Sequence, residues 1–202
     1  MSDFEGLFAL FGLMFGLIIA ELSLKTADAI DRHSERPVGI LTPALAFLVL
    51  TDVTNFWLLL WAARAMLRVK WHTVFGGVLL AIIYFLAASL VFPRTKHGWA
   101  NLDDHYWARK RIVAGGMVVT NLAVDGLMLS RSLPAWNDWM FYFYFPAYLV
   151  GLVGLVFSRS RRWDLLFLAC AIGINLIAGF DLLPGSHWGE RMGLLFGTTP
   201  YL

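Results

Sequence analysis

The feature that most restricts the possible folds is a series of apolar stretches, each about 20 residues long, separated by short charged segments. The chain has 202 residues, of which 59% are hydrophobic and 15% are charged, whereas a soluble domain is about 45–50% apolar and about 25% charged. A helix of this length and apolarity can cross the hydrocarbon core of a bilayer. The sequence therefore predicts an all-α membrane bundle, with residues 1–202 forming one integral membrane domain. Six transmembrane helices are expected at about residues 5–24, 39–65, 74–92, 112–129, 136–157 and 163–183, followed by a tail over 184–202 that is too short to span again.

Charge and cysteine content exclude several other classes of protein. The net charge is only +2, and the basic residues lie in short segments between the apolar stretches, so no nucleic-acid-binding surface is expected. The chain has one cysteine, Cys170, which excludes an intramolecular disulfide and a cysteine-rich metal site. Membrane lipid is the partner that this composition predicts.

The distribution of basic residues predicts an orientation in the membrane. Eleven of the 16 Lys and Arg residues lie between the first and second, third and fourth, or fifth and sixth helices. Because cytoplasmic loops carry the excess of Lys and Arg, these loops are expected in the cytoplasm and both termini on the outer side. The chain starts with MSDFEG, which lacks the basic region of a secretory signal. The first apolar stretch is therefore expected to be a retained helix.

The second apolar stretch, Leu41–Trp61, carries polar side chains at its centre. Thr51, Asp52 and Asn55 all lie there, and their spacing predicts that they share one side of the helix. A carboxylate near the middle of a membrane helix costs roughly 2.5 to 3.5 kcal/mol, so it is expected to face the protein interior and to have partners.

Polar residues at a similar depth occur in the fourth and sixth helices. Asn121 and Asp125 are separated by one turn of the fourth helix, and Asn175 lies in the sixth. Counted along their helices at about 1.5 Å per residue, Asp52, Asp125 and Asn175 all lie roughly 18–20 Å from the start. The sequence thus predicts one buried polar layer, an ion- or solute-binding site built from Thr51, Asp52, Asn55, Asn121, Asp125 and Asn175.

Two functions are compatible with this layer. The first is a transporter or channel for a proton, a cation or a small solute, in which the two carboxylates bind or relay the ion. The second is a structural or accessory subunit of a membrane assembly that binds a partner protein, a lipid or a hydrophobic pigment, the polar layer then only fixing how the helices pack. A homo-oligomer or a larger membrane complex is compatible with both, and no particular cofactor is predicted.

An enzyme is the least favoured class. The chain contains no GxSxG or HExxH motif. Its histidines fall in the segments expected between the helices or in the tail, which gives no support for a haem held by two intramembrane histidines; these residues are His33, His72, His97, His105 and His187.

The segment from Arg94 to Arg111 is the richest hydrophilic stretch. Its acids and histidines match no established metal-ligand spacing, so a metal site is the weaker of two interpretations. The favoured interpretation is an amphipathic helix that starts at Asn101-Leu102-Asp103, with an Asn or Asp as its cap. Lipid or interface contacts are then expected from Tyr106, Trp107, Arg109, Lys110 and Arg111.

Three stretches of the chain resemble a family of uncharacterised bacterial inner-membrane proteins with six helices. They are FGLMFGLIIAEL in the first helix, NFWLLLW in the second and NLDDHYWARKR before the fourth. The similarity covers about residues 5 to 125. It implies the six-helix topology and a bacterial inner membrane, and it implies no activity and no functional residue.

Overall fold

A computed structural model of the chain describes residues 3–31, 38–63, 69–93, 101–130, 139–180 and 182. The expected tail over 184–202 lies outside these residues. Within them the chain is all-helical, and the helices number six. They are α1 (Asp3–Asp31), α2 (Leu41–Ala62), α3 (Trp71–Ser89), α4 (Leu102–Leu129), α5 (Trp139–Phe157) and α6 (Arg161–Gly179).

The length and apolarity of the helices agree with the expected membrane bundle. Five of them, α1, α2, α3, α4 and α6, are long and apolar enough to cross a membrane. In α5 the apolar stretch is shorter, Phe141–Phe157, and Pro146 lies inside the helix as the sequence indicates.

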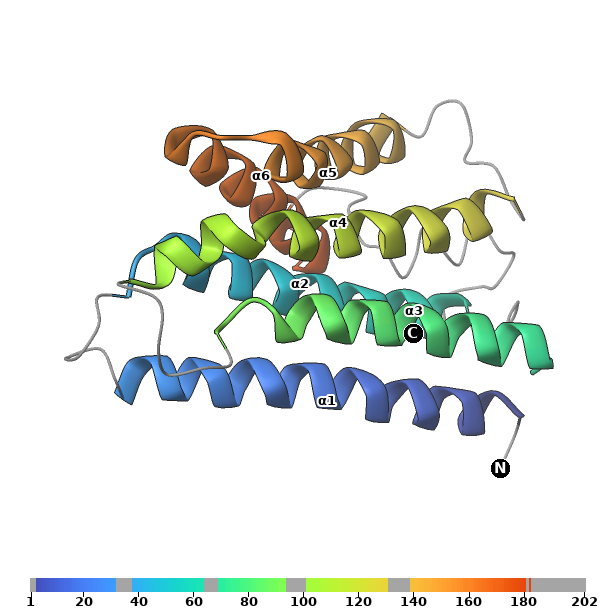
Figure 1. Ribbon diagram of the computed structural model, residues 1–202. Helices are drawn as coiled ribbons and strands as arrows, with labels where there is room; N and C mark the ends of the chain where they lie inside the picture. The colour runs from blue at the N-terminus through green and yellow to red at the C-terminus, as the bar shows by residue number, and fades with distance from the viewer. Residues whose placement is uncertain are drawn as a thin grey trace.

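The helices form one bundle in which α2 and α4 hold the central places (Figure 1). α1 lies along one side and packs against α2 and α3, while α5 and α6 pack together on the opposite side. α4 contacts α2, α3 and α5, and α2 also contacts α6. A polar side chain on α2 can therefore meet side chains from several other helices.

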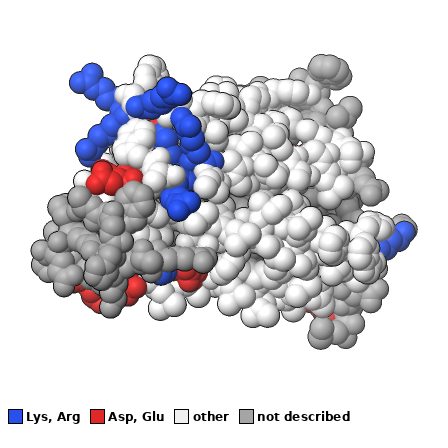
Figure 2. Space-filling view, in the orientation of Figure 1, with Lys and Arg blue, Asp and Glu red and all other residues white. Residues whose placement is uncertain are grey.

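The interior of the bundle is mainly apolar, and its outer surface is also apolar. Leu48, Val49 and Met117 are fully buried, whereas Leu13, Phe143 and Val150 on the outer surface are each more than 60% exposed. Figure 2 shows that charged side chains gather mainly at one end of the molecule and leave the surface along the helices uncharged. Apolar side chains on both the inside and the outside are what a bundle surrounded by lipid requires.

Three helices extend further than the sequence predicted, and α3 is one of them, since it begins at Trp71 and not near Val74. α1 continues to Asp31 instead of ending near Leu24, and the hydroxyl of Thr26 donates to the carbonyl of Leu22. α4 begins at Leu102 and runs without a break into the apolar stretch that starts at Ile112. The expected amphipathic helix and the fourth membrane helix are therefore one element. Its cap is Asn101, whose Oδ1 accepts a hydrogen bond from the backbone N–H of Asp104 at 2.8 Å.

Gly12 and Gly16 of α1 form a GxxxG pair, a pattern that permits close packing of membrane helices. One of the two glycines takes part in such a contact. A Cβ added to Gly12 would lie 2.6 Å from the ring of Trp57 on α2, whereas one added to Gly16 would meet nothing within 4 Å. The pair therefore does not act as a unit, because only Gly12 faces a neighbouring helix in this chain.

Candidate functional site

The carboxylate of Asp52 lies at the centre of the bundle and accepts hydrogen bonds from three other helices. Tyr148 on α5 donates to Oδ1 at 2.6 Å. Tyr84 on α3 donates to Oδ2 at 2.8 Å, and Nδ2 of Asn121 on α4 donates to the same oxygen at 3.1 Å. Asp52 is 3% exposed. One side chain of α2 thus ties α3, α4 and α5 together through charge-assisted hydrogen bonds, which are stronger than neutral ones.

The sequence analysis did not predict that Tyr84 and Tyr148 would donate hydrogen bonds to Asp52. Tyr84 has the position of an isolated polar side chain in an otherwise apolar helix, and Tyr148 lies two residues after Pro146. Tyrosines of membrane proteins usually gather at the two interfaces. A tyrosine well inside an apolar stretch is therefore a signal for a buried hydrogen-bond partner.

A second group of polar side chains joins α2 to α6. Nδ2 of Asn55 donates to Oδ1 of Asn175 at 2.9 Å, and Nδ2 of Asn175 donates to Oγ1 of Thr51 at 3.2 Å. Asn175 is 7% exposed. Thr51 and Asn55 lie one turn apart on the same face of α2 and so contact the same residue of α6, whereas Asp52 points about 100° from Thr51 and contacts α3, α4 and α5.

Asp125 completes the residues expected in the layer, and its surroundings differ from those of Asp52. It lies one turn after Asn121 on α4 and is partly buried. It forms no hydrogen bond or ion pair with another residue of the described chain. Asn121, one turn before Asp125 on the same face of α4, donates to Asp52 and so places the two carboxylates near each other. The structure therefore brings the expected residues to one region, where Asp52 accepts three hydrogen bonds and the partly buried Asp125 accepts none among the described residues.

Basic side chains do not neutralise these two carboxylates in the part of the chain that the structure describes. The ion pairs found there are Lys110 with Asp164 and Arg161 with Asp103, both at the end of the bundle where α4 and α6 begin. Hydroxyl and amide groups surround Asp52 instead. Such groups orient a carboxylate but do not cancel its charge.

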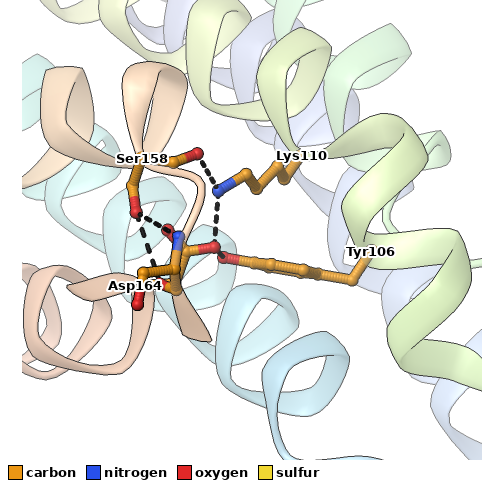
Figure 3. A network of polar contacts seen from close by, with 5 residues as sticks. Tyr106, Lys110, Ser158 and Asp164 are labelled. Atoms are coloured by element: carbon orange, nitrogen blue, oxygen red, sulfur yellow. Dashed lines mark hydrogen bonds and ion pairs between the residues drawn. The ribbon is translucent and has the colours of Figure 1, made fainter. Parts of the chain in front are cut away.

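A separate buried polar cluster lies at that end of the bundle (Figure 3). Nζ of Lys110 on α4 lies 2.5 Å from Oδ2 of Asp164 on α6, and it also donates to the carbonyl of Ser158 at 2.8 Å. The hydroxyl of Tyr106 donates to the same Oδ2 at 3.0 Å. Asp164 is fully buried, and Lys110 and Tyr106 are no more than 2% exposed. The cluster fixes the first turns of α4 against the connection between α5 and α6.

This cluster corrects part of the expected lipid contact. Tyr106 and Lys110 point into the protein, because the buried carboxylate of Asp164 provides a partner that the loop sequence alone does not reveal. Trp107 is partly buried, with Nζ of Lys110 4.3 Å above its ring. Arg109 and Arg111 are exposed, as a lipid contact requires.

The described residues contain no group of three or more His, Cys, Asp or Glu side chains placed to hold a metal ion. His105 lies in α4 and not in a loop, and its Nε2 is 2.9 Å from the carbonyl oxygen of Leu90 at the end of α3. His72 is exposed in the first turn of α3. These two positions differ from the expected ones because α3 and α4 both begin earlier than the apolar pattern indicates.

No protein-family model, curated protein or solved structure matches the chain. The resemblance to six-helix bacterial inner-membrane proteins therefore stays a prediction. What can be said of function depends on the two carboxylates and their surroundings.

Proposed function

We propose that this protein moves a proton or another small cation across a bacterial inner membrane, and that Asp52 and Asp125 are the groups that carry it. In this proposal all six helices, including α5, cross the membrane. The observation that supports it is a pair of carboxylates inside the bundle, Asp52 and, one turn of α4 beyond the donor Asn121, Asp125. Neither has a basic partner among the described residues.

The physical reason is the cost of charge at the centre of a bilayer. One carboxylate there costs roughly 2.5 to 3.5 kcal/mol, and two neighbouring ones also repel each other. A bound proton or cation removes this cost, and exchange of that ion with the two sides of the membrane is transport. Intramembrane acids in transporters commonly form such relays.

The two carboxylates have different roles in this proposal. Asp52 is held by Tyr84, Tyr148 and Asn121, so its position is fixed. Asp125 has no such donors in the described chain and can take up and release an ion without breaking a hydrogen bond between helices. Asp125 is therefore the exchanging group, and Asp52 modulates its affinity through charge.

Ion flux into liposomes that contain the purified protein tests this proposal. Asp125→Asn is expected to lower the flux at least tenfold without changing the thermal unfolding temperature, because the exchanging carboxylate is removed and no hydrogen bond between the described helices is lost. Asp52→Asn is expected to lower both the flux and the thermal unfolding temperature. The amide cannot accept all three hydrogen bonds, and leaving a buried donor unpaired costs about 1–3 kcal/mol.

Asp28→Asn is the matched control, because Asp28 is exposed near the end of α1, and its flux should equal that of the unmodified protein. The proposal would be contradicted if Asp125→Asn left the flux unchanged. It would also be contradicted if the unmodified protein gave no more flux than empty liposomes.

A structural or accessory subunit is the second candidate, and the three hydrogen bonds that Asp52 accepts from three different helices favour it. A carboxylate that accepts from three helices fixes their packing whether or not an ion moves. Hydrogen bonds between membrane helices are worth about 0.6 kcal/mol on average, so three of them add modestly to stability and strongly to specificity. In that case a partner protein should remain bound through purification in a mild detergent, and Asp125→Asn should have no effect on flux.

A further inference from the structure

Five exposed arginines gather at the end of the bundle where α4 and α6 begin. They come from two segments that are far apart in the sequence, with Arg109 and Arg111 on α4 and Arg159, Arg161 and Arg162 around the start of α6. Figure 2 shows Lys and Arg side chains concentrated at this end of the molecule. These five residues are referred to below as the arginine cluster.

The buried contacts of Lys110 bring the two segments together. Lys110 lies between Arg109 and Arg111, and its Nζ contacts the carbonyl of Ser158, the residue before Arg159. The same Nζ pairs with Asp164, which follows Arg162 by two residues. The protein thus uses a buried ion pair to hold like charges next to each other, although their mutual repulsion opposes that arrangement.

The charge of the arginine cluster is largely uncompensated. Among the described residues, the one acid that pairs with a member is Asp103, whose Oδ2 lies 3.8 Å from a guanidinium nitrogen of Arg161. Arg161 is exposed in this pair, whereas Asp103 is partly buried. Arg109, Arg111, Arg159 and Arg162 form no ion pair within the described ranges. A guanidinium presents a planar fork of donors that binds phosphate through two hydrogen bonds.

Exposed apolar side chains lie next to these arginines in the sequence, at the end of α5 and on α4 and α6. Phe157 is 74% exposed at the end of α5, Trp163 is 56% exposed in the first turn of α6, and Ile112 is 51% exposed on α4. A group of cations bordered by apolar and aromatic side chains fits a molecule with a phosphate and acyl chains.

We infer that the arginine cluster binds the headgroup of an anionic phospholipid, and that Phe157, Trp163 and Ile112 contact its acyl chains. This inference is independent of transport, since the cluster lies at the end of the bundle, away from Asp52 and Asp125. It also differs from a general attraction to the membrane surface, because the arginines of two segments share one ligand.

Titration of the detergent-purified protein with phosphatidylglycerol and with phosphatidylcholine of the same acyl chains, followed by native mass spectrometry, tests the inference. The unmodified protein should bind phosphatidylglycerol at least tenfold more tightly than phosphatidylcholine. Arg111→Gln, Arg159→Gln and Arg162→Gln combined should lower the affinity for phosphatidylglycerol at least tenfold, because one basic side chain near an anionic lipid surface contributes about a fivefold effect.

The matched control removes three basic residues from the segment between α2 and α3, by Arg64→Gln, Arg68→Gln and Lys70→Gln, and should keep the affinity. A variant that combines Arg111→Lys, Arg159→Lys and Arg162→Lys should have an affinity for phosphatidylglycerol between those of the unmodified protein and the Gln variant, because the charge is kept and the planar fork of donors is lost. Equal binding of the two lipids, an unaffected Gln variant, or an equal loss in the control would overturn the inference. So would displacement of the lipid by equimolar inorganic phosphate, which would indicate a site for a soluble anion.

Discussion

At the scale of single residues, the carboxylate of Asp164 has unequally satisfied oxygens. Oδ2 accepts hydrogen bonds from Lys110 and Tyr106, whereas Oδ1 is buried with no hydrogen-bond partner among the described residues. A buried ion pair of this kind stabilises a fold less than its short distance implies, because both charges lose their hydration. The loss of stability on breaking the ion pair therefore depends on whether one charge or both charges are removed.

Lys110→Met alone should destabilise the protein by about 3–5 kcal/mol, because it leaves the Asp164 carboxylate buried and unpaired. Lys110→Met combined with Asp164→Leu should recover most of that loss, apart from about 1 kcal/mol for the hydroxyl of Tyr106. Denaturant unfolding in one detergent measures both. Lys25→Met, on α1, is the control and should have little effect; equal loss in the single and double variants would contradict coupling between the two charges.

At the scale of helices, α3 and α4 pack closely at one glycine. A Cβ on Gly116 would lie 2.8 Å from the Cβ of Ala87, whereas one on the adjacent Gly115 would meet nothing within 4 Å. This contact sets the separation of the two helices that present Tyr84 and Asn121 to Asp52. The hydrogen bonds to Asp52 therefore depend on Gly116, which has no side chain that could take part in them.

Gly116→Leu should destabilise the protein by about 1–3 kcal/mol, because the added side chain forces α3 away from α4. Gly115→Leu changes the same residue type in the same helix turn without a clash, and it should be neutral or slightly stabilising because Leu favours a helix more than Gly does. Thermal unfolding in a single detergent compares the two. If Gly115→Leu is the more damaging change, the packing of α3 on α4 is not as described.

At the scale of the whole molecule, the described charges gather mainly at the end where α2, α4 and α6 begin. The positive-inside rule predicts that this end lies in the cytoplasm, which keeps the expectation that both termini lie on the outer side a prediction to be tested. The arginine cluster would face the anionic cytoplasmic leaflet, which agrees with the lipid that we infer there.

Labelling of single cysteines by a membrane-impermeant thiol reagent tests this orientation in a Cys170→Ser background. Asp104→Cys, at the start of α4, should be labelled in inside-out vesicles and protected in right-side-out vesicles. Lys70→Cys, just before α3, should give the opposite result; both positions are exposed. The reverse pattern would place the arginine cluster on the outer side.

Hydrophobic patterning was enough to predict the all-helical fold and the approximate place of every helix, because an apolar stretch of membrane length has few alternatives to a helix. It also indicated that the polar residues of α2, α4 and α6 lie at one depth, since depth follows from counting along a helix. The starts of α3 and α4 and the end of α1 were placed wrongly, because helices can extend beyond the hydrophobic region into polar sequence.

The sequence by itself determined which residues are too costly to leave facing lipid, and Asp52 and Asp125 are two of these. Only the tertiary structure decided which partners they find. Tyr84 and Tyr148 approach Asp52 from α3 and α5, and Lys110 turns inward to Asp164, because these contacts depend on which helices are neighbours and how each is rotated. Periodicity along one chain does not show which helices are neighbours or how each is rotated. The packed bundle therefore decides that Asp52 accepts three hydrogen bonds whereas Asp125 accepts none from the described residues.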